Sequence, residues 1–138
     1  MAVLYDGACK FCRWCVAMIL RWDREHQLNP VEIQSPGGQL LLASIPPIER
    51  LWSAHVVMAD GSILSGADAA PALLRALPLG GGLAALVSTV MPLSAATYRV
   101  VAKSRGFVGR MLPESWCADA ERIIADRRRG ITPPTTAR

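Results

Sequence analysis

Two cysteines at the start of an amphipathic helix, directly after a short apolar strand, constrain this chain more than any other feature. Residues 2–5 are expected to form a buried strand, and the Asp6-Gly7 pair predicts the turn that ends it. Cys9 and Cys12 follow at once. Apolar side chains then recur with the spacing of one helix face, at Phe11, Trp14, Cys15, Met18, Ile19 and Trp22. The pattern predicts a strand, a tight turn and a helix whose first turn carries two thiols.

The position of each cysteine along this helix predicts a different role. A thiol at a helix N-terminus meets unpaired N–H groups and the positive end of the helix dipole, which lower its pKa. Cys9 is therefore predicted to be the nucleophile, and Lys10 adds a nearby positive charge. Cys12 is close enough to attack a mixed disulfide at Cys9 and is the predicted resolving thiol. Cys15 lies within the apolar stripe and is expected to be buried.

Asp6 is the third candidate catalytic residue. If it is partly buried, its carboxyl group could accept the Cys12 proton, because desolvation raises a carboxyl pKa toward neutrality. An Asp before a Gly is also ordinary turn chemistry, and a turn or N-cap role is favoured for it. Cys117, near the start of the last predicted helix, is expected to be structural or an accessory thiol, and sequence alone does not place it.

The remaining pattern predicts an α/β fold. Further strands are expected over 31–34, 55–58 and 62–64, the last two joined around Asp60-Gly61, and helices over 39–43 and 68–77, with Asp68 as a cap. With the first strand and helix, the order is βαβαββα, which is the connectivity of a thioredoxin-like domain. Additional C-terminal helices are expected over 83–91, 94–104 and 115–128, the second ended at Gly106.

One domain is expected, because 138 residues of which 51% are hydrophobic can bury one core of ordinary size. It should span residues 1–128, with the helical extension from about 79 to 128, and leave 129–138 as a flexible tail. The uncharged stretch between Arg75 and Arg99 approaches the length of a membrane span. Prolines and glycines break it, so two buried or interfacial helices are predicted and no membrane contact is expected.

Residues Leu4-Tyr5-Asp6-Gly7-Ala8-Cys9-Lys10-Phe11-Cys12 resemble the signature of the DCC family of thiol-disulfide oxidoreductases, named for its Asp-x-x-Cys-x-x-Cys pattern. Segments 65–69, 74–78 and 98–105 resemble later blocks, so the resemblance runs from about Val3 to Arg105. It implies a thioredoxin-like fold and dithiol/disulfide activity, with Asp6, Cys9 and Cys12 at matching positions. Unlike thioredoxins, this chain has no proline directly before the strand expected at His55. We therefore expect a preference for a small thiol or one dedicated partner over general protein substrates.

The sequence thus predicts a cytoplasmic thiol-disulfide oxidoreductase that uses no cofactor. Its partners would be a disulfide-containing protein or small thiol substrate and an electron donor that the sequence does not identify. The cytoplasmic assignment rests on an N-terminal segment unlike a signal peptide and on cysteines too crowded for a secreted disulfide framework.

Two other functions stay open. Cys9, Cys12 and Cys15, with Cys117, His26 or His55, could bind zinc or an iron–sulfur cluster. The chain could also be a non-catalytic interaction domain. Nucleic-acid binding is not expected, because much of the net charge of +4 sits in Arg127, Arg128 and Arg129, which are interpreted as part of a solvated, frayed tail.

Overall fold

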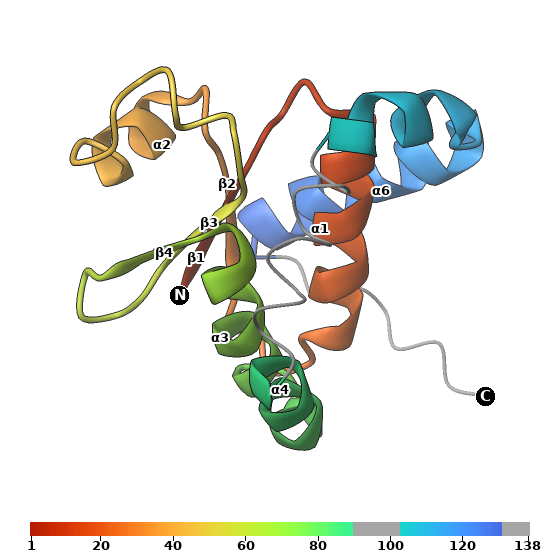
Figure 1. Cartoon of the computed structure of the whole chain (residues 1–138). Coiled ribbons are helices and arrows are strands. Elements are labelled where there is room, and N and C mark those ends of the chain that lie inside the picture. The colour runs from red at the N-terminus through yellow and green to blue at the C-terminus, as the bar shows by residue number, and fades with distance from the viewer. Residues whose placement is uncertain (90–102, 131–138) are drawn as a thin grey trace.

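The structure, a computed structural model, describes residues 1–89 and 103–130. Most of the helix expected over 94–104 and nearly all of the tail expected over 129–138 lie outside these residues. In the part that is described, a mixed sheet is flanked by helices on both faces (Figure 1).

The sheet has four strands in the order β2-β1-β3-β4. β1 (Ala2–Tyr5) pairs in parallel with β2 (Asn29–Glu32) and antiparallel with β3 (His55–Val57), which pairs antiparallel with β4 (Ile63–Ser65). Successive side chains of a strand point to opposite faces, and β1 therefore contributes to two cores. Val3 and Tyr5 pack with α-helical residues such as Val16, and Leu4 packs with Ile33 and Leu42 on the other face. The strand that leads to the cysteines is thus a buried, central one.

The helices divide between the two faces. α1 (Lys10–Trp22), α3 (Ala69–Arg75) and α6 (Glu114–Arg128) lie on one side of the sheet, and α2 (Pro36–Leu41) lies on the other (Figure 1). α1 packs against α6, and α3 packs against α4 (Gly80–Thr89). A 3-10 turn, Gly66–Asp68, precedes α3, and residues 103–111 are also helical. The order from β1 to α3 is the predicted βαβαββα order.

β2 begins earlier than predicted. Asn29 and Pro30 lie inside it, although they were expected to end the preceding connection. The N–H groups of Asn29 and Ile33 donate to the Met1 and Tyr5 carbonyls of the β1 segment, both at 2.9 Å. The N–H groups that point to β1 come from every second residue, and Pro30 is not one of them. Its nitrogen therefore faces away from β1, and because β2 is an edge strand no donor is needed there.

α2 also differs from its prediction of 39–43, because it begins at Pro36 and ends at Leu41. Ser35 caps it, its Oγ accepting from the Gly38 N–H at 3.1 Å. Gly38 lies inside this helix, and a Cβ at this position would lie 2.1 Å from the Glu32 carbonyl oxygen. The glycine is required by close backbone approach and does not interrupt the helix.

Three further helix predictions need correction. Asp68 does not cap α3, because it has helical dihedral angles and its side chain makes no capping bond. The helix at 103–111 continues through Gly106 rather than ending there. α4 begins at Gly80, three residues before its predicted start at 83, and the rest of the uncharged segment, from residue 90, lies outside the described residues. Over the described chain, no helix has both the length and the apolar character to cross a membrane.

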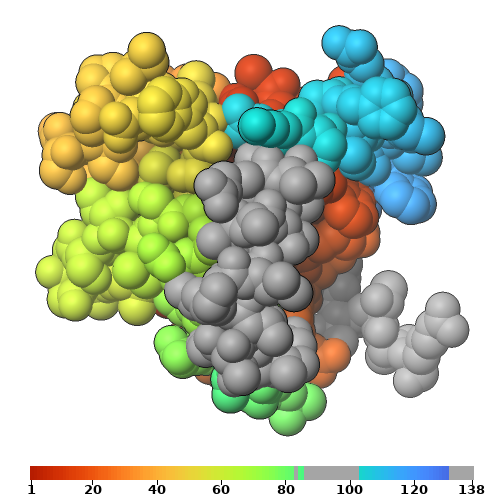
Figure 2. All heavy atoms as spheres, in the orientation of Figure 1, coloured from red at the N-terminus to blue at the C-terminus, as the bar shows by residue number. Residues whose placement is uncertain are grey.

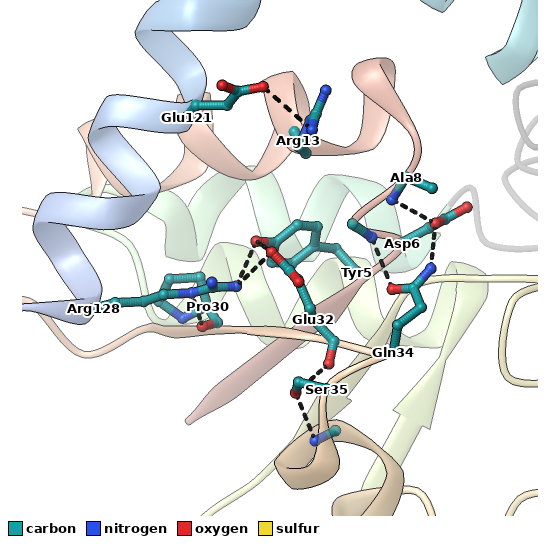
Figure 3. A network of polar contacts seen from close by, with 12 residues as sticks. Tyr5, Asp6, Ala8, Arg13, Pro30, Glu32, Gln34, Ser35, Glu121 and Arg128 are labelled. Carbon is teal, nitrogen blue, oxygen red and sulfur yellow. Dashed lines mark hydrogen bonds and ion pairs between the residues drawn. The ribbon is translucent and has the colours of Figure 1, made fainter.

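The end of α6 is only in part the solvated segment that was expected, because Arg129 is exposed but Arg127 and Arg128 make contacts within the fold. Arg127, 8% exposed, forms an ion pair of 2.5 Å with the fully buried Asp23, just after α1. Arg128 donates to the Tyr5 hydroxyl at 2.8 Å and pairs with Glu32 at 3.1 Å (Figure 3). Burial raises the pKa of Tyr5 to about 12, so its hydroxyl stays protonated at neutral pH. These two arginines therefore link α6 to the end of α1 and to strands β1 and β2.

Candidate active site

Cys9 and Cys12 lie where β1 ends and α1 begins. The Cys9 N–H donates to the Asp6 carbonyl at 3.2 Å, which closes the predicted turn. Cys9 is the N-cap residue of α1, and Cys12 lies in the first helical turn. The two form a disulfide with their Cα atoms 5.2 Å apart, within the usual range for such a bond.

The helix end supplies a hydrogen bond to the Cys9 sulfur. Cys9 Sγ accepts from the Cys12 backbone N–H at 3.1 Å, in the way that a serine or aspartate oxygen caps a helix. In the reduced protein the same N–H group and the helix dipole would favour a thiolate at Cys9. Cys9 therefore lies at the N-terminus of the helix, as the sequence predicted, and its role as nucleophile stays a prediction.

Asp6 is partly buried beside these cysteines and is held by two hydrogen bonds. Its Oδ1 accepts from the Ala8 N–H at 3.0 Å and from Gln34 Nε2 at 2.7 Å (Figure 3). Gln34 Oε1 in turn accepts from the Gly7 N–H at 3.0 Å. The bond to Ala8 agrees with the turn role favoured for Asp6. Gln34 was not predicted as part of this site.

Two cavities meet at the disulfide. The larger, of about 600 Å³, is lined by Cys9 but not by Cys12. The smaller, of about 210 Å³, is lined by Cys12 and Cys15 together with apolar side chains such as Phe11 and Ile19. Asp6 and Arg105 line both. The two cysteines of the pair therefore border different cavities.

The segment before β3 lies opposite Cys12. Ser53 and Ala54 line the smaller cavity together with Cys12. The residue directly before β3 is thus Ala54, where a thioredoxin would have a proline. Arg105 Nη2 donates to the Leu51 carbonyl at 2.7 Å, which ties the helix at 103–111 to this segment. Sequence reasoning did not select Arg105 as a site residue, although it closes the last segment that resembles the DCC family.

Cys15 is less buried than predicted. It is partly exposed and lines the smaller cavity, and desolvation raises the pKa of its thiol to about 11. The buried residues of α1 are Val16, Ala17 and Leu20, none of which belongs to the apolar stripe that the sequence predicted. The shift has a physical cause, because α6 packs against α1 in addition to the sheet. Trp14 stacks on Trp116 of α6 at 6.1 Å between ring centroids.

The other candidate ligands lie apart from the disulfide. Cys117 is a buried free thiol on α6, and His26 is exposed with a φ of 55°. His55 is buried, with Nδ1 2.7 Å from Ser65 Oγ and Nε2 2.9 Å from the Arg50 carbonyl, and burial lowers its pKa. In the residues that the structure describes, no group of three or more His, Cys, Asp or Glu side chains could hold a metal ion.

A comparison with protein families gives a match over more than half of the chain. The model of the family described as DCC1-like thiol-disulfide oxidoreductase matches residues 3–110. This stretch includes Asp6, Cys9, Cys12 and Arg105, and it ends before α6. No curated protein and no solved structure gives a significant match.

Proposed function

Because the chain belongs to the DCC1-like thiol-disulfide oxidoreductase family, we propose that it catalyses thiol-disulfide exchange through Cys9 and Cys12. The observation that carries this proposal is the Cys9–Cys12 disulfide at the N-terminus of α1. A disulfide at this position is a redox couple whose reduced form would be favoured by the helix dipole.

The fold that we propose for this activity is thioredoxin-like. The element order βαβαββα supports it, as does a central β1 that delivers the cysteines to the start of α1. A CxxC pair at this point of a βαβ unit is the usual context of a thioredoxin-like redox motif.

In the proposed reaction, the Cys9 thiolate attacks a substrate disulfide. A bond forms between Cys9 Sγ and one substrate sulfur, and the other substrate sulfur leaves as a thiolate and takes a proton. Cys12 then loses its proton and attacks Cys9 Sγ, so the protein disulfide forms and the second substrate thiol is released. Two electrons pass from the protein to the substrate, and a thiol donor returns them.

The two cavities support the assignment of roles. Cys9 lines the larger cavity, which has room for a substrate, and this favours it as the attacking thiol. Cys12 shares the smaller cavity with Asp6, the carboxylate that we propose as acceptor of its proton. The substrate would be a protein disulfide or a small thiol, and a cytoplasmic location stays part of the proposal.

The test compares single-cysteine variants in a disulfide-reduction assay. Cys9→Ser should abolish turnover, whereas Cys12→Ser should stop after one reaction and leave a mixed disulfide at Cys9 that mass spectrometry can detect. Cys15→Ser is the matched control, because it removes a thiol from the same helix and should keep multiple turnover. Full activity in the Cys9→Ser variant would refute the proposal.

A further inference from the structure

The larger cavity beside Cys9 is strongly cationic. Lys10, Lys103, Arg105 and Arg110 line it, and Asp6 is the one carboxylate among the described residues that line it. We propose that this cavity binds a low-molecular-weight thiol or disulfide that carries carboxylate groups, and holds its sulfur against Cys9. This inference rests on the proposed function and adds the class of substrate.

Most of this positive charge is not paired with a carboxylate of the residues that the structure describes. In the described part of the chain, Lys103, Arg105 and Arg110 form no ion pair. Lys10 pairs with Glu114 at 3.3 Å, but the Glu114 side chain is 93% exposed. Such a surface pair contributes little stability, so a substrate carboxylate can compete for Lys10.

Arg105 is the cation with the most defined position. Its bond to the Leu51 carbonyl uses one of the five N–H donors of a guanidinium, so others can reach a carboxylate. The helix that carries it also comes close to the start of α1, since a Cβ on Gly109 would lie 3.4 Å from the Phe11 nitrogen. Figure 2 shows this helix, in teal, beside the red N-terminal segment that includes the cysteines.

The size and content of the cavity select the kind of ligand. A volume of about 600 Å³ falls within the range of small-molecule sites. Carboxylates match lysine and arginine side chains, and the cavity also reaches Cys9, which reacts with thiols and disulfides. A small anionic thiol satisfies both properties at once.

Two molecules of such a thiol are enough to reduce the Cys9–Cys12 disulfide. Its thiolate attacks Cys9 Sγ of the oxidised protein, forming a mixed disulfide, and Cys12 leaves as a thiolate and takes a proton. A second molecule of the thiol attacks the substrate sulfur of the mixed disulfide and releases Cys9. The protein gains two electrons, and two thiol molecules become one disulfide. The reverse sequence reduces the anionic disulfide.

The experiment measures how fast the reduced full-length protein reacts with disulfides of different charge. The probes are glutathione disulfide, which is anionic, 2-hydroxyethyl disulfide, which is neutral, and cystamine, which is cationic. Each rate constant is divided by that of dithiothreitol with the same disulfide, which removes differences in intrinsic reactivity. The corrected ratio of anionic to neutral rates should be about tenfold at low salt and should fall toward one in 1 M NaCl, where the Debye length is about 3 Å.

The matched variants locate the effect. Lys103→Gln combined with Arg110→Gln should lower the anionic-to-neutral ratio by roughly three- to tenfold, and both side chains are exposed, so folding should tolerate the change. Arg24→Gln removes an exposed charge just beyond the other end of α1 and should leave the ratio as it was.

The outcomes separate this inference from the proposed function. A corrected anionic-to-neutral ratio near one would refute the proposal that the cavity binds an anionic substrate, and so would a preference that the double variant does not reduce. In either case the proposed thiol-disulfide exchange would be unaffected. Failure of all three disulfides to oxidise the Cys9–Cys12 dithiol refutes the proposed function, and the inference with it.

Discussion

At the scale of single residues, the two halves of the CxxC pair differ in what surrounds them. Cys9 takes a hydrogen bond from the helix end and lines the cationic cavity, whereas Cys12 lines the smaller, mainly apolar one. In the reduced protein we therefore expect the helix end to favour a thiolate at Cys9, whereas the Cys12 thiol would lie in less polar surroundings. This asymmetry supports the order of attack and resolution that we propose.

Cys15 should be far less reactive than an ordinary thiol. Burial raises its pKa from 9.0 to about 11, so its thiolate population near pH 8 falls about 100-fold. Its alkylation by iodoacetamide in the reduced protein should rise about tenfold per pH unit up to pH 11. Peptide mapping by mass spectrometry measures this, with protein unfolded in urea as the control. Alkylation of Cys15 at the same rate in folded and unfolded protein would contradict the prediction.

Asp6→Asn tests whether the carboxylate has a role beyond the turn. Asparagine keeps an oxygen for the bonds from Ala8 and Gln34 but cannot accept the Cys12 proton. We expect the release of the second substrate thiol to slow roughly 10- to 100-fold near neutral pH, as for loss of a general base. Rapid mixing with a coloured disulfide separates this step from formation of the mixed disulfide. Gln34→Ala is the control, because it loosens the turn and keeps the carboxylate, and equal rates in both variants would leave Asp6 as a turn residue.

At the scale of elements, the features that depend on residues close in the sequence could be predicted from the sequence. The Asp-Gly turn and the helical spacing after it placed Cys9 at the start of α1. The face of α1 that is buried depends on α6, which lies about a hundred residues further along the chain, and the predicted apolar stripe therefore missed the buried Val16, Ala17 and Leu20. Gln34 reaches Asp6 only through the parallel register that sets Tyr5 opposite Glu32, so it required the strand pairing to be known.

Two adjacent glycines of α2 provide an element-scale prediction with a built-in control. Gly38→Ala places a Cβ against the Glu32 carbonyl oxygen and should destabilise the fold by about 1–3 kcal/mol. Gly37→Ala meets no atom within 4 Å and should be neutral or stabilise by up to about 1 kcal/mol, through helix propensity. Urea unfolding measures both. Equal free energies of unfolding for the two variants would show that the backbone contact at Gly38 is not required.

At the scale of the whole molecule, the C-terminal helix α6 packs against α1 and contributes to the core beside β1. α6 lies beyond the stretch that matches the family, yet Ile124 joins the core cluster of Val3 and Val16. Three ion pairs among the described residues also link α1 to α6: Lys10–Glu114, Arg13–Glu121 and Arg21–Asp119. No local pattern could have revealed them, because their members are about a hundred residues apart and charge alone does not choose partners. For the same reason, the run of three arginines suggested a solvated tail.

Arg127→Met should destabilise the fold far more than the loss of an exposed arginine, because it leaves Asp23 buried without its partner. Asp23 is fully buried, and its remaining bonds come from the backbone N–H groups of Gln27 and Leu28, at 3.0 and 2.9 Å. Breaking a buried pair in this way costs about 3–5 kcal/mol. Arg129→Met removes an arginine two residues further on, which forms an exposed pair with Asp126. It should change the free energy of unfolding by no more than about 1 kcal/mol.

Urea unfolding of both variants tests this contrast, and similar losses would contradict a structural role for the Arg127–Asp23 pair. The loss should be one of stability and not of chemistry. α1 is 13 residues long, so Asp23 lies about 20 Å along the helix from Cys9. Where Arg127→Met remains folded, its rate of exchange with a neutral disulfide should therefore match that of the unmodified protein. A slower rate in the folded variant would mean that α6 also positions the cysteines through α1.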